Sequence, residues 1–107
     1  MNDIVITRAE NGKTLNVHIG DKVIVYLDES PTTGYRWALD TEGEGIAILQ
    51  SSDYRPADVG KIGGGGQAVF TVAAQKVGHA TLRFKLWREW EGNSSIVDAV
   101  TVDVEVR

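Results

Sequence analysis

The chain has 107 residues, a formal net charge of -4 and no cysteine, and 42% of its residues are hydrophobic. A chain of this length suits one domain, spanning residues 1–107, and without cysteine it can form neither disulfides nor thiolate metal sites. Its lysines and arginines are not clustered, which argues against nucleic acid or an anionic membrane as the partner.

Period-two alternation of apolar and polar residues predicts an all-β protein. In chain order, the expected strands cover residues 4–8 at an edge, 15–19, 23–27, 35–39, 46–54, 68–73, 81–87 and 100–107. Turns rich in Gly, Asn, Asp or Pro separate these runs. Seven to eight short strands with one polar face each indicate an antiparallel two-sheet sandwich.

Three connections are expected to lie together at one end of this sandwich. Successive antiparallel strands reverse direction, so alternate connections emerge at the same end. Counted from the strand at 23–27, these connections are residues 28–34, 57–66 and 87–95. They also have the least ordinary compositions in the chain, which makes this end the candidate binding surface.

The first of these loops has the sequence Ser-Pro-Thr-Thr-Gly-Tyr over residues 30–35. Pro31 fixes its own φ and biases the preceding residue away from the helical region. The β-branched Thr32 and Thr33 add stiffness, and Gly34 permits a tight exit. A stiff, exposed loop loses little entropy when it docks on a partner, although the same composition is also typical of an ordinary turn.

The second loop contains four consecutive glycines, at positions 63–66. Glycines let another backbone approach closely, or they provide slack. The spacing of Gly63, Gly65 and Ala68 matches a dinucleotide-binding pattern, but such a site needs a helix where the alternation predicts a strand. We therefore expect no nucleotide.

The third loop places Trp87, Arg88 and Trp90 within four residues. Tryptophan and arginine are the residue types most enriched at the energetic centres of protein interfaces, while single exposed aromatic residues are common on any surface. Their combination favours a binding role. Trp37, by contrast, alternates with apolar residues on a central strand and is expected in the core.

Together, these loops resemble the chagasin-type family of cysteine-peptidase inhibitors. That family has an Asn-Pro-Thr-Thr-Gly-Tyr/Phe loop, a Gly-x-Gly-Gly loop and an Arg-Pro-Trp/Phe loop, which correspond here to residues 30–35, 63–66 and 88–90. The similarity also covers the Gly20-Asp21 turn, Trp37, Phe70 and Gly78.

The resemblance implies an immunoglobulin-like fold in a monomer that needs no cofactor or metal. It also implies reversible, tight-binding, non-covalent inhibition of papain-like cysteine peptidases, such as papain and enzymes of the cathepsin L type. The first loop would cover the catalytic cysteine, the glycine loop would pair its backbone with the peptidase, and the third loop would pack beside the cleft. The implied contact residues are Pro31, Thr32, Thr33, Gly34, Gly64, Gly65, Gly66, Arg88 and Trp90.

Two positions depart from the family pattern. Ser30 replaces the family asparagine, and its hydroxyl can still bond to a turn backbone. Glu89 replaces the family proline, which should loosen the third loop and place a carboxylate near the contact surface.

Two other functions compete with inhibition. One is a carbohydrate- or ligand-binding β-sandwich that uses Trp87 and Trp90 as a stacking platform. The other is a structural immunoglobulin-like adhesion module with inert loops. An enzyme is not expected, because His18, on a polar strand face, and His79, in a turn, lie near no nucleophile motif.

The start of the chain, Met1–Val5, has neither the basic nor the apolar region of a signal peptide. We therefore expect either a cytoplasmic protein or the mature form of a secreted or periplasmic one. No apolar run approaches the roughly 18 residues that a transmembrane helix requires.

Overall fold

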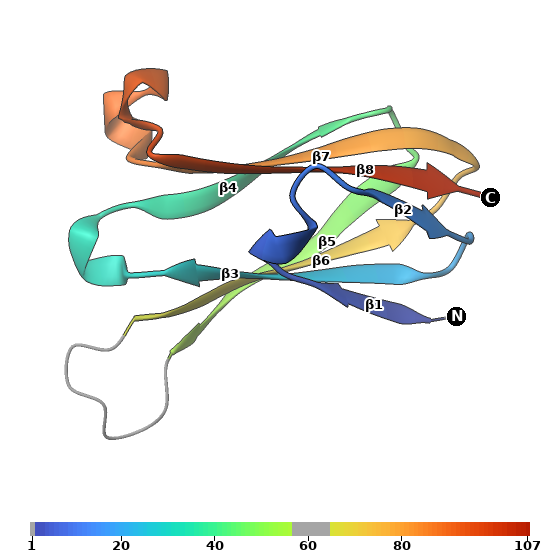
Figure 1. The fold of residues 1–107 in the computed structure, drawn as a ribbon, viewed down its shortest axis with the longest axis horizontal. Helices are drawn as coiled ribbons and strands as arrows, with labels where there is room; N and C mark the ends of the chain where they lie inside the picture. The colour runs from blue at the N-terminus through green and yellow to red at the C-terminus, as the bar shows by residue number, and fades with distance from the viewer. Residues whose placement is uncertain (1, 57–64) are drawn as a thin grey trace.

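A computed structural model describes residues 2–56 and 65–107 and shows a β-sandwich (Figure 1). The strands are β1 (Asp3–Ile6), β2 (Thr14–Val17), β3 (Lys22–Glu29), β4 (Arg36–Glu42), β5 (Ala47–Pro56), β6 (Gly66–Ala74), β7 (Gly78–Trp87) and β8 (Asp98–Val106). One sheet has the order β1-β3-β6-β5 and the other β2-β8-β7-β4. The all-β, immunoglobulin-like sandwich expected from the sequence is confirmed.

Short 3-10 turns are the helical elements of the described residues, at η1 (Arg8–Glu10), η2 (Pro31–Thr33), η3 (Glu89–Glu91) and η4 (Asn93–Ser95). No helix in residues 2–56 and 65–107 is both long and apolar enough to cross a membrane.

The first two strands pair differently from the others. β1 lies parallel to β3, and β2 lies parallel to β8, whereas the remaining neighbours are antiparallel. The chain leaves one sheet after β1 and joins the edge of the other at β2. At this corner, the Thr7 hydroxyl accepts a hydrogen bond from the Ala9 amide, and the Glu10 carboxylate accepts one from the Thr7 amide. This capping box stabilises the crossing locally.

The core contains the inward-facing residue of each alternating pair. On β8, the side chains of Val100, Val102, Val104 and Val106 are fully buried between the sheets, and each such burial contributes about 1.5–3 kcal/mol relative to exposure. Phe70 and Phe84 meet across the two sheets with their ring centroids 5.2 Å apart. Trp37 is also buried, as the alternation predicted.

Three local assignments from the sequence differ from the structure. The edge strand expected at 4–8 ends at Ile6, and η1 begins at Arg8. The strand predicted at 15–19 ends at Val17, because the Asp21 carboxylate accepts hydrogen bonds from the His18 and Asn2 amides and holds a turn there. These backbone donors lower the pKa of Asp21 below its usual range. His79 was expected in a turn but lies near the start of β7.

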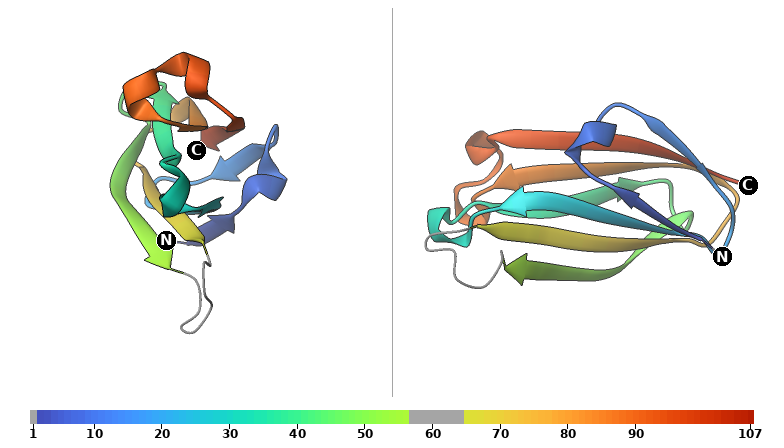
Figure 2. Two further views of the ribbon diagram at one scale, coloured as in Figure 1. Left: turned by 90° about the vertical axis from the view of Figure 1, so that its left-hand side faces the viewer. Right: turned by 60° about the horizontal axis from the view of Figure 1, so that its bottom comes forward.

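The predicted loop end is present. The β3–β4 and β7–β8 connections lie at one end of the sandwich, opposite both termini (Figure 1), and two further views show them side by side (Figure 2). Gly65 and Gly66 lead into β6 at the same end. Residues 57–64, which include Gly63 and Gly64, lie outside the described residues.

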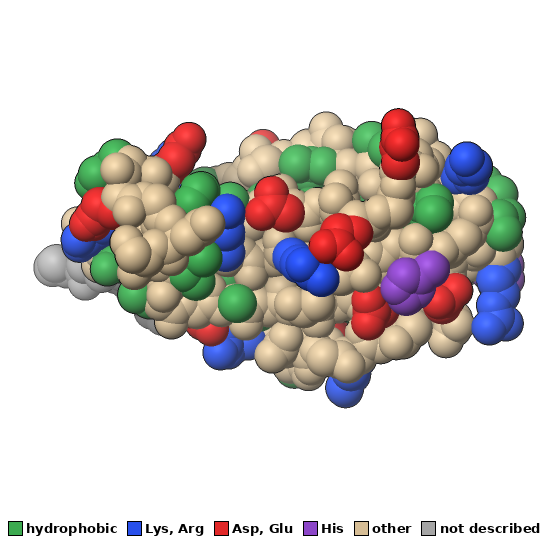
Figure 3. All heavy atoms as spheres, turned by 90° about the horizontal axis from the view of Figure 1, so that it is seen from above, with side chains coloured by type: hydrophobic (Ala, Val, Ile, Leu, Met, Phe, Trp, Pro, Cys, Tyr) green, Lys and Arg blue, Asp and Glu red, His purple; other side chains and the backbone are tan. Residues whose placement is uncertain are grey.

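Charged side chains of both signs are interspersed over the outer face of β7 and β8 (Figure 3). On this face, His79 pairs through Nδ1 with Glu105, and its Nε2 lies 3.3 Å from an Asp103 carboxylate oxygen. The Thr81 hydroxyl donates to the same oxygen of Asp103 at 2.8 Å. These contacts, led by the hydrogen bond to Glu105, raise the pKa of His79 above its ordinary value.

Replacing His79 with Gln should reduce the pH dependence of stability. Because the folded-state pKa is raised, the charged imidazole stabilises the fold fully below the unfolded pKa of about 6.5 and loses that effect as pH rises through the folded pKa. Thermal unfolding followed by circular dichroism at a series of pH values should show a flatter profile for His79→Gln. His18→Gln is the comparison, because the His18 side chain is 79% exposed and its Nδ1 lies as far as 4.0 Å from the Asp21 carboxylate, so its profile should change less. An equal pH dependence of stability in wild type and His79→Gln would contradict the stabilising role of the charged His79 side chain.

Candidate functional site

The base of the first loop is held by hydrogen bonds from Trp37 at the start of β4. Its backbone amide donates to the Glu29 carboxylate at 2.7 Å, and its indole Nε1 donates to the Asp28 carbonyl at 2.7 Å. Glu29 and Trp37 are only 7% and 8% exposed. Since β3 and β4 belong to different sheets, these bonds tie the sheets together where the loop emerges. Sequence reasoning missed Glu29, although it continues the inward alternation of β3.

The first loop is shaped by its own side chains. The Thr33 amide and hydroxyl both donate to the Ser30 carbonyl, at 3.3 and 2.8 Å. The Tyr35 amide donates to the Thr33 hydroxyl at 3.3 Å, and the hydroxyls of Ser30 and Thr32 are also 3.3 Å apart. Gly34 has a φ of +80°, which favours glycine. The loop is therefore a compact turn with little freedom left in its first half.

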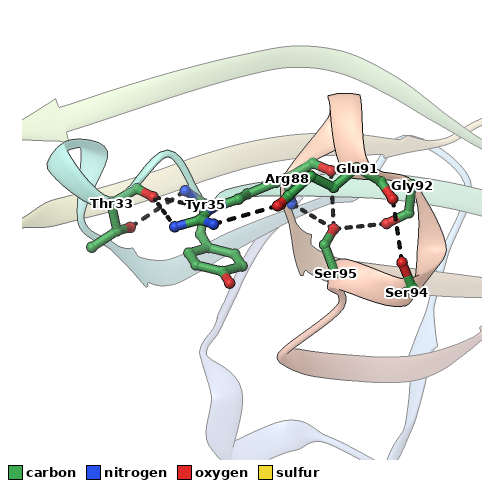
Figure 4. Close-up of polar contacts among 7 residues, drawn as sticks. All are labelled: Thr33, Tyr35, Arg88, Glu91, Gly92, Ser94 and Ser95. Carbon is green, nitrogen blue, oxygen red and sulfur yellow. Dashed lines mark hydrogen bonds and ion pairs between the residues drawn. The ribbon is translucent and has the colours of Figure 1, made fainter.

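The third loop reaches the first through Arg88 (Figure 4). Its guanidinium donates from Nε and Nη2 to the Thr33 carbonyl, at 3.3 and 3.2 Å. The guanidinium carbon also lies 4.4 Å from the centroid of the Tyr35 ring, in cation–π geometry. Two loops that are more than fifty positions apart in the chain are thus in direct polar contact.

The third loop itself folds around the Ser95 hydroxyl. This oxygen accepts a hydrogen bond from the Arg88 amide at 2.9 Å, and it lies 2.9 Å from the Arg88 carbonyl and 2.7 Å from the Gly92 carbonyl. The Ser94 hydroxyl donates to the Glu91 carbonyl at 3.3 Å. These bonds stabilise η3 and η4, and sequence reasoning did not identify either serine.

Trp90 projects from η3 and is 73% exposed. Its ring passes over the first loop, because a Cβ atom added to Gly34 would lie only 2.9 Å from Trp90 Cη2. Trp87 is different: it is partly buried on β7, with the Lys85 ammonium 3.6 Å from its ring centroid. The rings of Trp87 and Trp90 are therefore not equally exposed. This argues against the carbohydrate-binding alternative, because that alternative uses both rings as a stacking platform.

The start of β6 lies on the other side of the first loop. A Cβ atom added to Gly65 would lie 3.0 Å from the Glu29 carbonyl oxygen, and one added to Gly66 would lie 2.3 Å from the Arg55 carbonyl oxygen. A groove of about 790 Å³ opens here, lined in part by Thr33 and Gly65. Glycine is required at position 66 because any side chain there would collide with the Arg55 carbonyl of the neighbouring strand.

The structure thus brings most of the predicted contact residues to one end of the molecule. The first loop is central, with the third loop on one side and the start of β6 on the other (Figure 2). The residues placed there are Pro31, Thr32, Thr33, Gly34, Gly65, Gly66, Arg88 and Trp90. Gly64 lies outside the described residues.

The family model described as Chagasin family peptidase inhibitor I42 matches residues 16–106. The chain belongs to this family. Chagasin from Trypanosoma cruzi is 30% identical over 102 residues, which cover 91% of this chain and 92% of that protein.

Solved structures with the same fold include other inhibitors. One is the crystal structure of a cysteine protease inhibitor from Entamoeba histolytica, with a TM-score of 0.86 at 21% identity, covering 100% of this chain and 97% of that one. Another is an inhibitor solved in complex with falcipain-2, with a TM-score of 0.65 at 15% identity, covering 100% of this chain and 91% of that one.

Within the chagasin family pattern, Glu89 takes the place of a proline, yet it begins a hydrogen-bonded 3-10 turn. The Ser95 hydroxyl supplies a constraint at the point where the sequence predicted a looser loop. The other departure, Ser30, keeps its role in the turn mainly through its backbone carbonyl, which accepts both bonds from Thr33.

Gly34→Ala should displace Trp90, whereas Gly12→Ala should not. Both glycines have positive φ, at +80° and +84°, so each substitution should cost about 1–2 kcal/mol of stability from backbone strain. Only the new methyl at position 34 meets the Trp90 ring, since nothing lies within 4 Å of the Cβ position at Gly12. Chemical denaturation should give similar losses for both variants, and tryptophan fluorescence should change in Gly34→Ala alone. An identical spectrum for both variants would contradict the contact.

Proposed function

We propose that this chagasin-family chain inhibits papain-like cysteine peptidases reversibly, by inserting its first loop into the active-site cleft. The observation that carries the proposal is the convergence of Thr33, Gly34, Gly65 and Trp90 on one end of a rigid sandwich. The matching family model, which is described as a peptidase inhibitor, supports a peptidase as the partner, and a protein of the same fold has been solved in complex with falcipain-2.

Each loop has its own part in this proposal. Residues Pro31 to Gly34 form the plug, a narrow turn held by internal hydrogen bonds. The glycines at 64–66 approach the peptidase through their backbone. Trp90 supplies the large apolar surface typical of an interface hot spot, and Arg88 belongs to the same loop.

Such an inhibitor binds tightly because it loses little conformational entropy on docking. The turn around Thr33 and the loop around Ser95 are already formed in the free protein, so few backbone torsions need to be fixed in the complex. A preformed wedge also fills the cleft without an extended peptide bond placed for attack, so it is not consumed by the enzyme.

Titration of papain with the purified protein is the direct test. Steady-state rates at increasing inhibitor concentration should fall to near zero, and dilution of the complex should restore activity. Full papain activity in the presence of micromolar protein would overturn the proposal. Binding to a polysaccharide with no effect on papain would instead support the carbohydrate-binding alternative.

Trp90→Ala should raise the inhibition constant by about tenfold or more, because truncating an interface tryptophan typically costs about 2 kcal/mol or more. The domain should remain folded, since the side chain lies mostly in solvent. Val77→Ala, which truncates an exposed apolar side chain in the β6–β7 turn at the opposite end, is the matched control and should leave the constant unchanged. An unchanged constant for Trp90→Ala would remove this residue from the contact surface.

A further inference from the structure

We propose that Arg88 is a positioning residue, which fixes the Thr33–Gly34 peptide group and so sets the shape of the inhibitory wedge. This inference rests on the proposed function, because the shape of the first loop matters for inhibition only if that loop enters the cleft. It assigns to Arg88 a role inside the inhibitor in place of a direct contact with the peptidase.

The guanidinium is turned toward its own protein. Two of its nitrogens donate to the Thr33 carbonyl, and its third, Nη1, lies 3.4 Å from the Glu91 carboxylate. One face of the group covers the Tyr35 ring (Figure 4). The Arg88 side chain is 36% exposed, compared with 73% for the neighbouring Trp90 residue. Most of the hydrogen-bonding capacity of Arg88 is therefore already used before a peptidase arrives.

The Thr33–Gly34 peptide group is the part of the first loop that needs an external restraint. The bonds from Thr33 to the Ser30 carbonyl fix the residues before it. Gly34 follows, and glycine accepts positive and negative φ about equally well. The local backbone itself therefore offers little resistance to rotation of this peptide plane, through ψ of Thr33 and φ of Gly34. The two bonds from Arg88 to the carbonyl oxygen oppose that rotation.

Lysine cannot replace arginine in this arrangement. An ammonium group carries the same charge, but it lacks the planar fork that directs two N–H groups at one oxygen while lying flat on an aromatic ring. Arg88→Lys should keep the electrostatic field of the loop and lose the restraint on the Thr33 carbonyl.

Loss of a restraint and loss of a contact have different kinetic signatures. If the peptide plane rotates freely in the unbound inhibitor, only the fraction of molecules with the correct orientation can bind, so the apparent affinity falls by that fraction. The effect then appears in the association rate constant. Loss of a direct contact with the peptidase would appear mainly as faster dissociation.

The test compares wild type, Arg88→Lys and Arg83→Lys. Arg83 is the matched control because it lies on the same strand, β7, and pairs with Glu42 at 2.9 Å, away from the loops. Stopped-flow measurements with papain give the association and dissociation rate constants. Amide NMR relaxation of the free proteins reports directly on the motion of Gly34, and circular dichroism verifies the fold of each variant.

For Arg88→Lys we expect increased mobility at the Gly34 amide, an association rate constant about tenfold lower and a nearly unchanged dissociation rate constant. Arg83→Lys should match wild type in all three. Unchanged Gly34 relaxation in Arg88→Lys, or a change confined to dissociation, would overturn the inference. A wild-type protein that fails to inhibit papain would overturn the proposed function instead, and the NMR comparison would still decide whether Arg88 restrains the loop.

Discussion

The loop end of this protein depends on the contact between Trp37 and the last two residues of β3. With 107 residues and no cysteine, the chain has no covalent crosslink to hold its two sheets in register. The Trp37 amide and indole bond to Glu29 and Asp28 across the gap between the sheets. A buried carboxylate left without its donor would cost about 1–3 kcal/mol, so the two strands are fixed relative to one another. The first loop joins these strands and takes its direction from them.

A second set of contacts restrains the exposed loops that extend from the core. Arg88 joins the third loop to the Thr33 carbonyl, and the Trp90 ring lies over Gly34. The first and third loops therefore do not move independently on the sandwich. Each restrains the other, through the Thr33 carbonyl and through a glycine at position 34 that leaves room for the Trp90 ring. Preorganisation of this kind lowers the entropic cost of association, which is how a small domain with few contact residues can bind tightly.

Much of this arrangement was predictable from the sequence, because alternation decides which face of a strand is buried and strand direction decides which loops share an end. The valines of β8 and the position of Trp37 followed from alternation alone. Glu29 did not, since a carboxylate at a strand end is ordinarily exposed and only the tertiary structure reveals its donor. The contact of Arg88 with Thr33 depends on side-chain torsions that no spacing encodes. The parallel pairing of β1 with β3 and of β2 with β8 depends on where the chain changes sheets, which alternation does not record.

The departure at Glu89 shows that a loop can be restrained by different physical means. A proline stiffens a loop through its ring, without a partner elsewhere. In this chain, the Ser95 hydroxyl bonds the backbone on both sides of η3, so the restraint comes from hydrogen bonds that close the loop on itself. A restraint of this kind leaves the Glu89 amide present, which proline would remove, and it depends on a residue six positions further along the chain. Substitutions near residue 95 therefore affect the third loop as directly as substitutions within the motif itself.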